Sequence, residues 1–280
     1  MNNYLLLAIS MLCALGANVI KKHSTAKFGS KSSLRFFFNA AVSLSCVFVF
    51  LIISGIPEIS KFTLLLGMLF GTVTALQFLF SLMSYENGPF SYTSVIVSLS
   101  TIIPALSGYL IWNEKIASIQ IVGMALMLIC FALSVDFSKN QKKASALWYV
   151  YVFVTFIATG FIGVMQKWHQ SSEYKGELDG FLIVAFSCSF ILSLIGFFFF
   201  SFKQNGNEAL DSSDKKSGIS AVFILLMVLC GVCAAANNKM NLYLSGIMDS
   251  AIFFPVVNGG GMILSTVTSI IFSPSWKMKV

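Results

Sequence analysis

The chain has 280 residues, of which 57% are hydrophobic and 10% are charged, and its mean hydropathy is +0.84. Soluble domains carry about 25% charged residues, so a water-soluble fold of this size could not bury so much apolar surface. The net charge of +7 does not indicate nucleic acid, because the basic residues stand in short connections between apolar runs and form no contiguous basic face.

Nine apolar runs are long enough to cross a bilayer as helices, at about 20 residues per span. They cover residues 3–20, 35–55, 62–85, 90–112, 118–136, 146–168, 180–202, 219–242 and 249–272. Turn sequences separate them, for example Ser54-Gly55-Ile56-Pro57-Glu58 and Asn87-Gly88-Pro89. The first run has no basic stretch before it and no small-residue cleavage site, so we expect a span rather than a signal peptide.

Parts of the first half recur in the second half. Tyr85-Glu86-Asn87-Gly88 precedes an apolar run, as does Tyr243-Leu244-Ser245-Gly246, and the ends of the first and sixth runs, Asn18 to Lys22 and Gly163 to Lys167, are also alike. Five spans separate the corresponding elements, and an odd number reverses the chain direction. Apolar helices also resemble one another by composition alone, which leaves coincidence as the alternative.

The predicted fold is an all-α polytopic membrane protein built from two inverted-topology repeats, an architecture of many secondary transporters. The first repeat is expected at residues 1–137 with five helices and the second at 146–280 with four. The stretch 138–145, which contains three lysines, is the expected hinge.

Four segments carry a resemblance to a known family: Tyr92-Thr93-Ser94-Val95-Ile96-Val97-Ser98-Leu99, Ile103-Pro104-Ala105-Leu106, Trp112-Asn113-Glu114-Lys115 and Gln120-Ile121-Val122-Gly123. In them the chain resembles the drug/metabolite transporter superfamily, specifically its ten-helix members with two EamA-type domains. The resemblance covers nearly the whole chain, but its motifs are diffuse and hardly specify the substrate. It implies export or exchange of a small solute through a central cavity.

Two features depart from that family. Its ten-helix members keep both termini cytoplasmic, whereas the lysines and arginine here divide into thirteen on the side of the first loop and five on the other. We follow the charge count, which places the N-terminus outside. After residue 272 the family pattern also expects a charged turn and a tenth helix, and the sequence continues instead with Ser273-Pro274-Ser275-Trp276-Lys277.

Polar side chains inside predicted spans indicate a cavity or a partner helix, because a central Lys costs about 2.5–3.5 kcal/mol on insertion scales. The densest group, Asn237, Asn238, Lys239 and Asn241, is expected to face the central cavity. Lys239 could bind an anionic or carbonyl group, or extend its ammonium group toward the membrane surface. The further cavity candidates are Asn18, Gln77, Ser81, Tyr85, Tyr92, Ser98, Gln166 and Asn258.

Sequence motifs for covalent chemistry are missing. We find no zinc-protease, nucleophile-elbow or phosphate-loop pattern, and expect no enzyme activity, metal site or cofactor. Cys230 and Cys233 form a C-x-x-C interpreted as helix packing, since His23 and His169 are expected in distant loops. Glu114 is expected to cap or neutralise the turn before the fifth span.

The leading hypothesis is a transporter in the cell membrane that moves a small metabolite or drug-like solute by alternating access, in the direction of export. The alternative is a non-transporting truncated paralogue or frameshifted product, and an intramembrane enzyme is disfavoured. The expected partners are the solute and the lipid bilayer, with a homodimer left open.

The charge count makes a topological prediction. A reporter fused after residue 31 should lie in the cytoplasm, so a phosphatase that is active only in the periplasm should be inactive there and a green fluorescent protein bright. An active phosphatase with a dark fluorescent fusion would restore the orientation of the ten-helix relatives.

Overall fold

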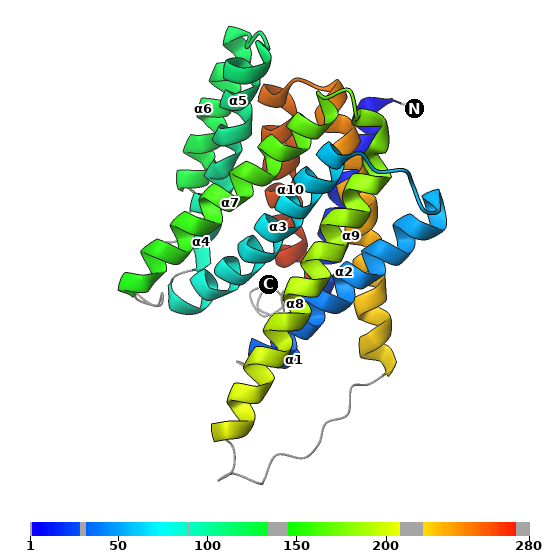
Figure 1. Ribbon diagram of the computed structural model, residues 1–280. Helices are drawn as coiled ribbons and strands as arrows, with labels where there is room; N and C mark the ends of the chain where they lie inside the picture. The colour runs from blue at the N-terminus through cyan, green and yellow to red at the C-terminus, as the bar shows by residue number, and fades with distance from the viewer. Residues whose placement is uncertain (1, 29–31, 89, 134–144, 208–220, 273–280) are drawn as a thin grey trace. The chain divides into compact units, whose positions relative to one another are not determined.

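A computed structural model describes residues 2–28, 32–88, 90–133, 145–207 and 221–272. All regular elements in these ranges are helices (Figure 1), which confirms the predicted all-α class. They are α1 (Asn3–Phe28), α2 (Ser32–Ser54), α3 (Lys61–Asn87), α4 (Phe90–Ser98), η1 (Leu99–Thr101), α5 (Ile102–Trp112), α6 (Ser118–Leu133), α7 (Ala146–Gln170), η2 (Lys175–Glu177), α8 (Leu178–Asn207), α9 (Ala221–Ile247) and α10 (Ser250–Phe272).

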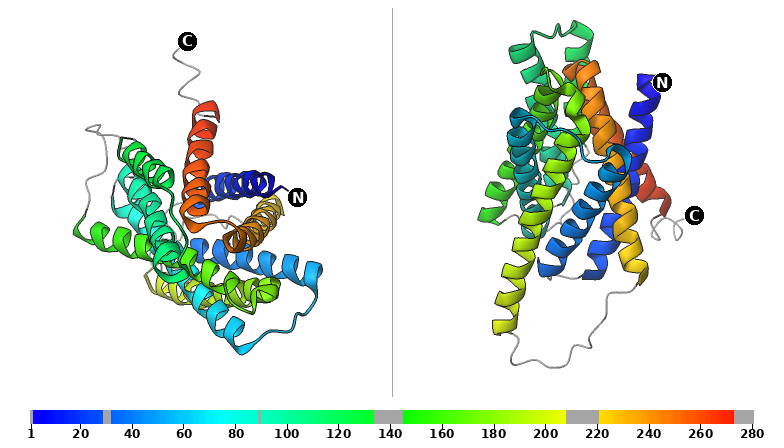
Figure 2. Two further views of the ribbon diagram at one scale, coloured as in Figure 1. Left: turned by 90° about the horizontal axis from the view of Figure 1, so that it is seen from above. Right: turned by 45° about the vertical axis from the view of Figure 1, so that its right-hand side comes forward.

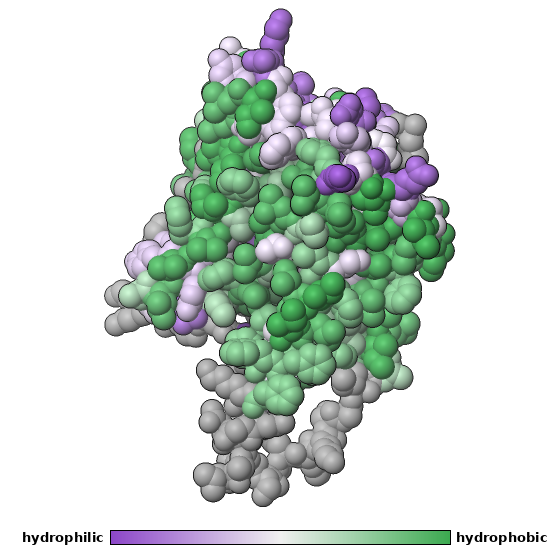
Figure 3. Space-filling view, viewed as in Figure 1, coloured by the Kyte–Doolittle hydropathy of each residue, from purple (hydrophilic) through white to green (hydrophobic). Residues whose placement is uncertain are grey.

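Within the described ranges, seven stretches are long and apolar enough to cross a membrane, and they lie in α1, α2, α3, α4 to α5, α7, α8 and α9. Large apolar side chains lie exposed along them, for example Ile52 at 83% and Phe202 at 75%. The face in Figure 3 is hydrophobic over most of its area, with hydrophilic side chains gathered toward its upper end. Because such a surface is stable only against lipid, the chain is a multi-pass membrane protein. The spans predicted at α6 and α10 stay predictions.

The predicted span 90–112 is not one uniform α-helix. It contains the 3₁₀ turn η1 between α4 and α5, while Ser98, Thr101 and Ile102 keep right-handed helical dihedral angles. Pro104 explains the tightening, because it has no N–H to donate and its ring crowds the carbonyl one turn earlier. The backbone is therefore wound more tightly over these three residues, and the helical path continues from α4 into α5.

Two predicted features lie outside the described residues. These are most of the hinge 138–145 and the end of the chain after Phe272. The inverted relation of the two repeats stays a prediction.

The described residues form two compact units, each drawn from both halves of the sequence. The first unit comprises residues 1–11, 73–176 and 240–280, and the second comprises 12–72 and 177–239. Helices α1, α3 and α9 contribute residues to both.

In the second unit α2 packs along α8, as both views of Figure 2 show. Phenylalanine pairs such as Phe36–Phe200, with ring centroids 5.2 Å apart, make up much of this contact. Two polar links lie among them: the Asn39 amide donates to Ser193 Oγ at 2.7 Å, and Ser43 Oγ lies 3.3 Å from Ser189 Oγ. Hydrogen bonds between helices add stability in lipid, where apolar association has little driving force.

In the first unit α7 is the central element, since α4, η1 and α5 all pack on it. Trp148 lies near its start and donates from Nε1 to Thr93 Oγ1 at 2.9 Å. Gly163 faces Pro104 and Phe254 so closely that an added methyl group would overlap both side chains. A second cluster joins Leu7, Leu244, Phe253 and Phe254.

Close helix contact in the second unit predicts an effect of Gly71→Ala. The added methyl group would overlap the carbonyl oxygen of Ala185 on α8, so the two helices must separate. Overpacking costs about 1–3 kcal/mol, which outweighs the roughly 1 kcal/mol gain in helix propensity. The melting temperature in detergent should fall.

Gly123→Ala is the matched control, because nothing lies within 4 Å of the position that its methyl group would occupy. It should leave the melting temperature unchanged or raise it slightly. Equal behaviour of the two variants would show that α3 and α8 are not in close contact at Gly71.

Candidate functional site

Lys167 projects from the last turn of α7 into the first unit. The helix begins at a Ser145 cap, whose hydroxyl accepts a hydrogen bond from the Trp148 N–H at 3.2 Å, and it runs without interruption to Gln170. Lys167 lies close to the predicted end of the span 146–168, yet its side chain is only 8% exposed. A buried lysine needs a partner, because an unpaired ammonium group in an apolar environment is strongly unfavourable.

That partner is Glu114, which lies in the connection after α5. Asn113 adopts the left-handed conformation (φ 52°, ψ 32°) that short polar residues tolerate, and it ends the helix. The N–H of Glu114 then donates to the carbonyl of Gly108 at 3.1 Å, which folds the connection back over α5. The resulting turn directs the carboxylate into the unit.

The expectation that Glu114 caps the turn before α6 is wrong. The N–H of Ala117 at the start of α6 donates instead to Gln120 Oε1 at 2.8 Å, which is one half of a capping box. Glu114 serves a different helix: its Oε2 accepts from the N–H of Ser250 at 2.7 Å, at the first residue of α10. The sequence pattern showed the need for a cap but not which helix end would receive it.

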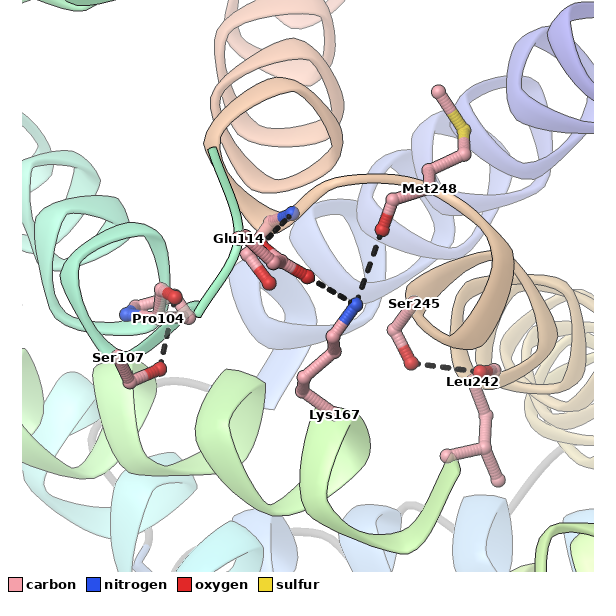
Figure 4. A network of polar contacts seen from close by, with 8 residues as sticks. Pro104, Ser107, Glu114, Lys167, Leu242, Ser245 and Met248 are labelled. Atoms are coloured by element: carbon pink, nitrogen blue, oxygen red, sulfur yellow. Dashed lines mark hydrogen bonds and ion pairs between the residues drawn. The ribbon is translucent and has the colours of Figure 1, made fainter. Parts of the chain in front are cut away.

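Figure 4 shows the resulting network. Lys167 Nζ forms an ion pair with Glu114 Oε1 and donates a hydrogen bond to the carbonyl of Met248 at 3.3 Å. The Glu114 side chain is 10% exposed. One carboxylate and one ammonium group thus join three segments: the connection after α5, the end of α7, and the turn between α9 and α10.

The electrostatics of this network favour an anion between two positive partners. The carboxylate meets a full charge on Lys167 and the partial positive charge at the N-terminus of α10. Shielding from water strengthens these attractions, and it makes the loss of either partner costly.

Gly108 and Ser250 complete the surroundings of the carboxylate. A side chain at Gly108 would overlap Glu114 Oε2 and come within 2.7 Å of Ser250 Cβ, so only glycine allows this approach. The Ser250 hydroxyl is buried and has no hydrogen-bond partner among the described residues. A polar atom beside the carboxylate is therefore left unsatisfied.

Among the predicted cavity candidates in the first unit, Asn241 has the clearest partner. Its Oδ1 accepts a hydrogen bond from Ser10 Oγ at 2.9 Å, which joins α9 to α1. Gln166, which precedes Lys167 in α7, is buried. Ser98 is the last residue of α4, directly before the 3₁₀ turn. Gln77, Ser81, Tyr92 and Asn258 are half-buried, and the side chain of Tyr85 lies outside the described part.

In the second unit Lys239 pairs with Asp179 of α8, with Nζ 2.8 Å from Oδ1 and 3.0 Å from Oδ2. Its side chain is 35% exposed, so this pair is much less buried than the first. Asn238 donates to the carbonyl of Ala234 in its own helix at 2.8 Å. Asn237 is half-buried and Asn18 is exposed. Within the predicted cluster, Lys239, Asn238 and Asn241 therefore each interact with a different partner.

Sequence reasoning missed Glu114, Lys167 and Ser250 as one site, although the first two stand in segments that it singled out. Lys167 was placed at the end of the sixth run and was used only in the count of basic residues on each side of the membrane. The expectation that the histidines lie in loops is also wrong, since His23 is in α1 and His169 is in α7. His169 is fully buried, and its Nδ1 lies 3.1 Å from the amide nitrogen of Gln170.

The described residues offer little support for other kinds of site. They contain no group of three or more His, Cys, Asp or Glu side chains placed to hold a metal ion. A wholly apolar pocket of about 270 Å³ lies between α3 and α7, lined by Leu76, Phe153, Ile157 and Phe161 among others. It has no polar group to orient a ligand, whereas Glu114 and Lys167 do.

Comparison with known proteins provides evidence on the fold only. No family model matches the sequence, and no curated protein does. Among 22 solved chains that match, one crystal structure, described only as that of a protein, has a TM-score of 0.66 at 11% sequence identity. The similarity covers 99% of this chain and 90% of the other. The chain is therefore similar in architecture to a protein of comparable length.

The buried pair predicts a large effect of Lys167→Met on stability. Removing one partner leaves the Glu114 carboxylate uncompensated, which costs about 3–5 kcal/mol when a pair is buried. The melting temperature in detergent should fall strongly, and the double variant Lys167→Met with Glu114→Gln should recover part of the loss. The two effects are therefore non-additive.

Lys239→Met provides the comparison, because the Lys239–Asp179 pair is less buried and the penalty for breaking an ion pair falls as its exposure rises. It should lower the melting temperature much less than Lys167→Met. An equal loss from both variants, or strict additivity in the cycle at Glu114, would contradict the buried pairing.

Proposed function

We propose that the chain is a transporter that moves a small metabolite or drug-like solute across the cell membrane by alternating access, in the direction of export. The observation that carries the proposal is the Glu114–Lys167 pair, which lies buried where the ends of apolar helices meet. Ionisable groups in such places are costly, and in membrane proteins they commonly belong to solute or ion pathways.

Alternating access requires polar contacts that close one end of the protein and that can be broken and reformed. The network has this character, because one carboxylate joins the turn after α5, α7 and the start of α10. The tightening at η1 offers a second element that supports motion, since mid-helix 3₁₀ turns often mark hinges.

The family resemblance in the sequence supports the same class of function. Two of the resembling segments, Ile103-Pro104-Ala105-Leu106 and Trp112-Asn113-Glu114-Lys115, contain Pro104 beneath η1 and Glu114 of the network. The proposal assigns no covalent reaction to the chain, and its partners are the solute and the bilayer.

The direct test is solute movement in proteoliposomes. Purified protein reconstituted with an internal pool of unlabelled solute should take up the labelled form of that solute faster than protein-free vesicles. The panel should include amino acids, carboxylic acids, sugars and organic cations. Saturable, counterflow-driven uptake of any member supports the proposal.

Two variants make the test specific. Lys167→Met should lower the uptake rate of the folded, reconstituted protein, because it removes the ion pair that joins α7 to Glu114. Val150→Ile, on the same helix with its side chain 54% exposed, should have no effect. A folded wild-type protein that moves no member of the panel, by counterflow or in expressing cells, would favour a chain without transport activity.

A further inference from the structure

We propose that Lys167, the N-terminus of α10 and the Ser250 hydroxyl form a carboxylate-binding site, which Glu114 fills when no solute is bound. A solute with a carboxylate group would compete with Glu114 for the same donors. Binding at this site is argued from the contacts alone, and its use in transport rests on the proposed function.

The donors are those that a carboxylate requires. Lys167 Nζ supplies a full positive charge, and the Ser250 N–H supplies a hydrogen bond aligned with the dipole of α10. Glu114 shows that a carboxylate fits these donors, because each of its two oxygens interacts with one of them. The site is thus a preformed carboxylate receptor whose occupant belongs to the chain itself.

The Ser250 hydroxyl is a second and independent pointer to a ligand. It is buried and lacks a hydrogen-bond partner among the described residues. It lies close to Gly108, as the Glu114 carboxylate does. Glu114 therefore leaves one available donor unused. A free carboxylate, with no covalent tether to the connection after α5, could accept from both the N–H and the hydroxyl of Ser250.

The two sides of the pair also differ in how firmly they are held. Lys167 and Ser250 are parts of long helices, whereas Glu114 stands in a short connection between α5 and α6, next to the left-handed Asn113. Its neighbours Asn113 and Lys115 are exposed. Exchange of anions is therefore expected to move the Glu114 side chain and to leave the donors in place.

Chemical rescue tests the proposal without any assumption about the solute. Glu114→Ala removes the internal carboxylate and should lower the melting temperature of the purified full-length protein. Sodium acetate should restore at least half of that loss, while sodium chloride at equal ionic strength should not. The double variant Glu114→Ala with Lys167→Met removes the charge that attracts acetate, so acetate should have no specific effect on it.

Two milder variants keep the test decisive if Glu114→Ala is hard to purify. Glu114→Gln keeps the shape but loses the charge, and Glu114→Asp keeps the charge on a shorter arm. Acetate should stabilise both more than it stabilises the wild type, in which the tethered carboxylate competes at high effective concentration. The proposal is overturned if no folded variant responds to acetate beyond chloride, or if none folds even when purified in acetate.

Transport measurements separate this inference from the proposed function. If the site receives the solute, carboxylic acids in the panel should be taken up in preference to their amides, and Ser250→Ala should lower their apparent affinity more than their maximal rate. Uptake of neutral solutes without acetate rescue would support the transport function and contradict the carboxylate-binding site. Acetate rescue without uptake of any solute would keep the site and reject transport.

Discussion

The arrangement of the first unit depends on one electrostatic constraint, which is that Lys167 cannot be buried without an anion. Hydrophobic burial does little to order helices in lipid, because the acyl chains are as apolar as leucine side chains. Directional contacts must therefore decide how the helix ends meet. The Glu114 carboxylate meets this need for α7 and for α10 at once, and Gly108 leaves the room for it to do so.

The positions of most helices were predictable from sequence, although α1 runs to Phe28 and α8 to Asn207, beyond their predicted ends at 20 and 202. The predicted span 62–85 corresponds to α3 at Lys61–Asn87, and 146–168 corresponds to α7 at Ala146–Gln170. The physical reason is that backbone N–H and C=O groups in lipid must form hydrogen bonds with each other. A long apolar run satisfies this requirement by forming a helix. Local chemistry also located breaks correctly, as at Gly55, where a positive φ of 67° follows the end of α2.

Side-chain partners were much harder to predict, because they depend on which helix ends meet in space. Asn238 and Asn241 look alike in the sequence of α9, yet one bonds its own helix and the other reaches Ser10. Lys167 and Lys239 each pair with an acidic residue, yet the Lys167 side chain is 8% exposed and that of Lys239 is 35% exposed. Abundant phenylalanine is typical of lipid-facing helices, but several of these residues, such as Phe38 and Phe50, lie buried in helix contacts.

The order of synthesis gives the network a further consequence. Glu114 is translated before Lys167, and the turn at Met248 to Ser250 follows only after α8 and α9 have been made. The carboxylate therefore cannot reach its final set of donors while the ribosome is still producing the middle of the chain. Completion of the network is therefore a late event in the biogenesis of the chain.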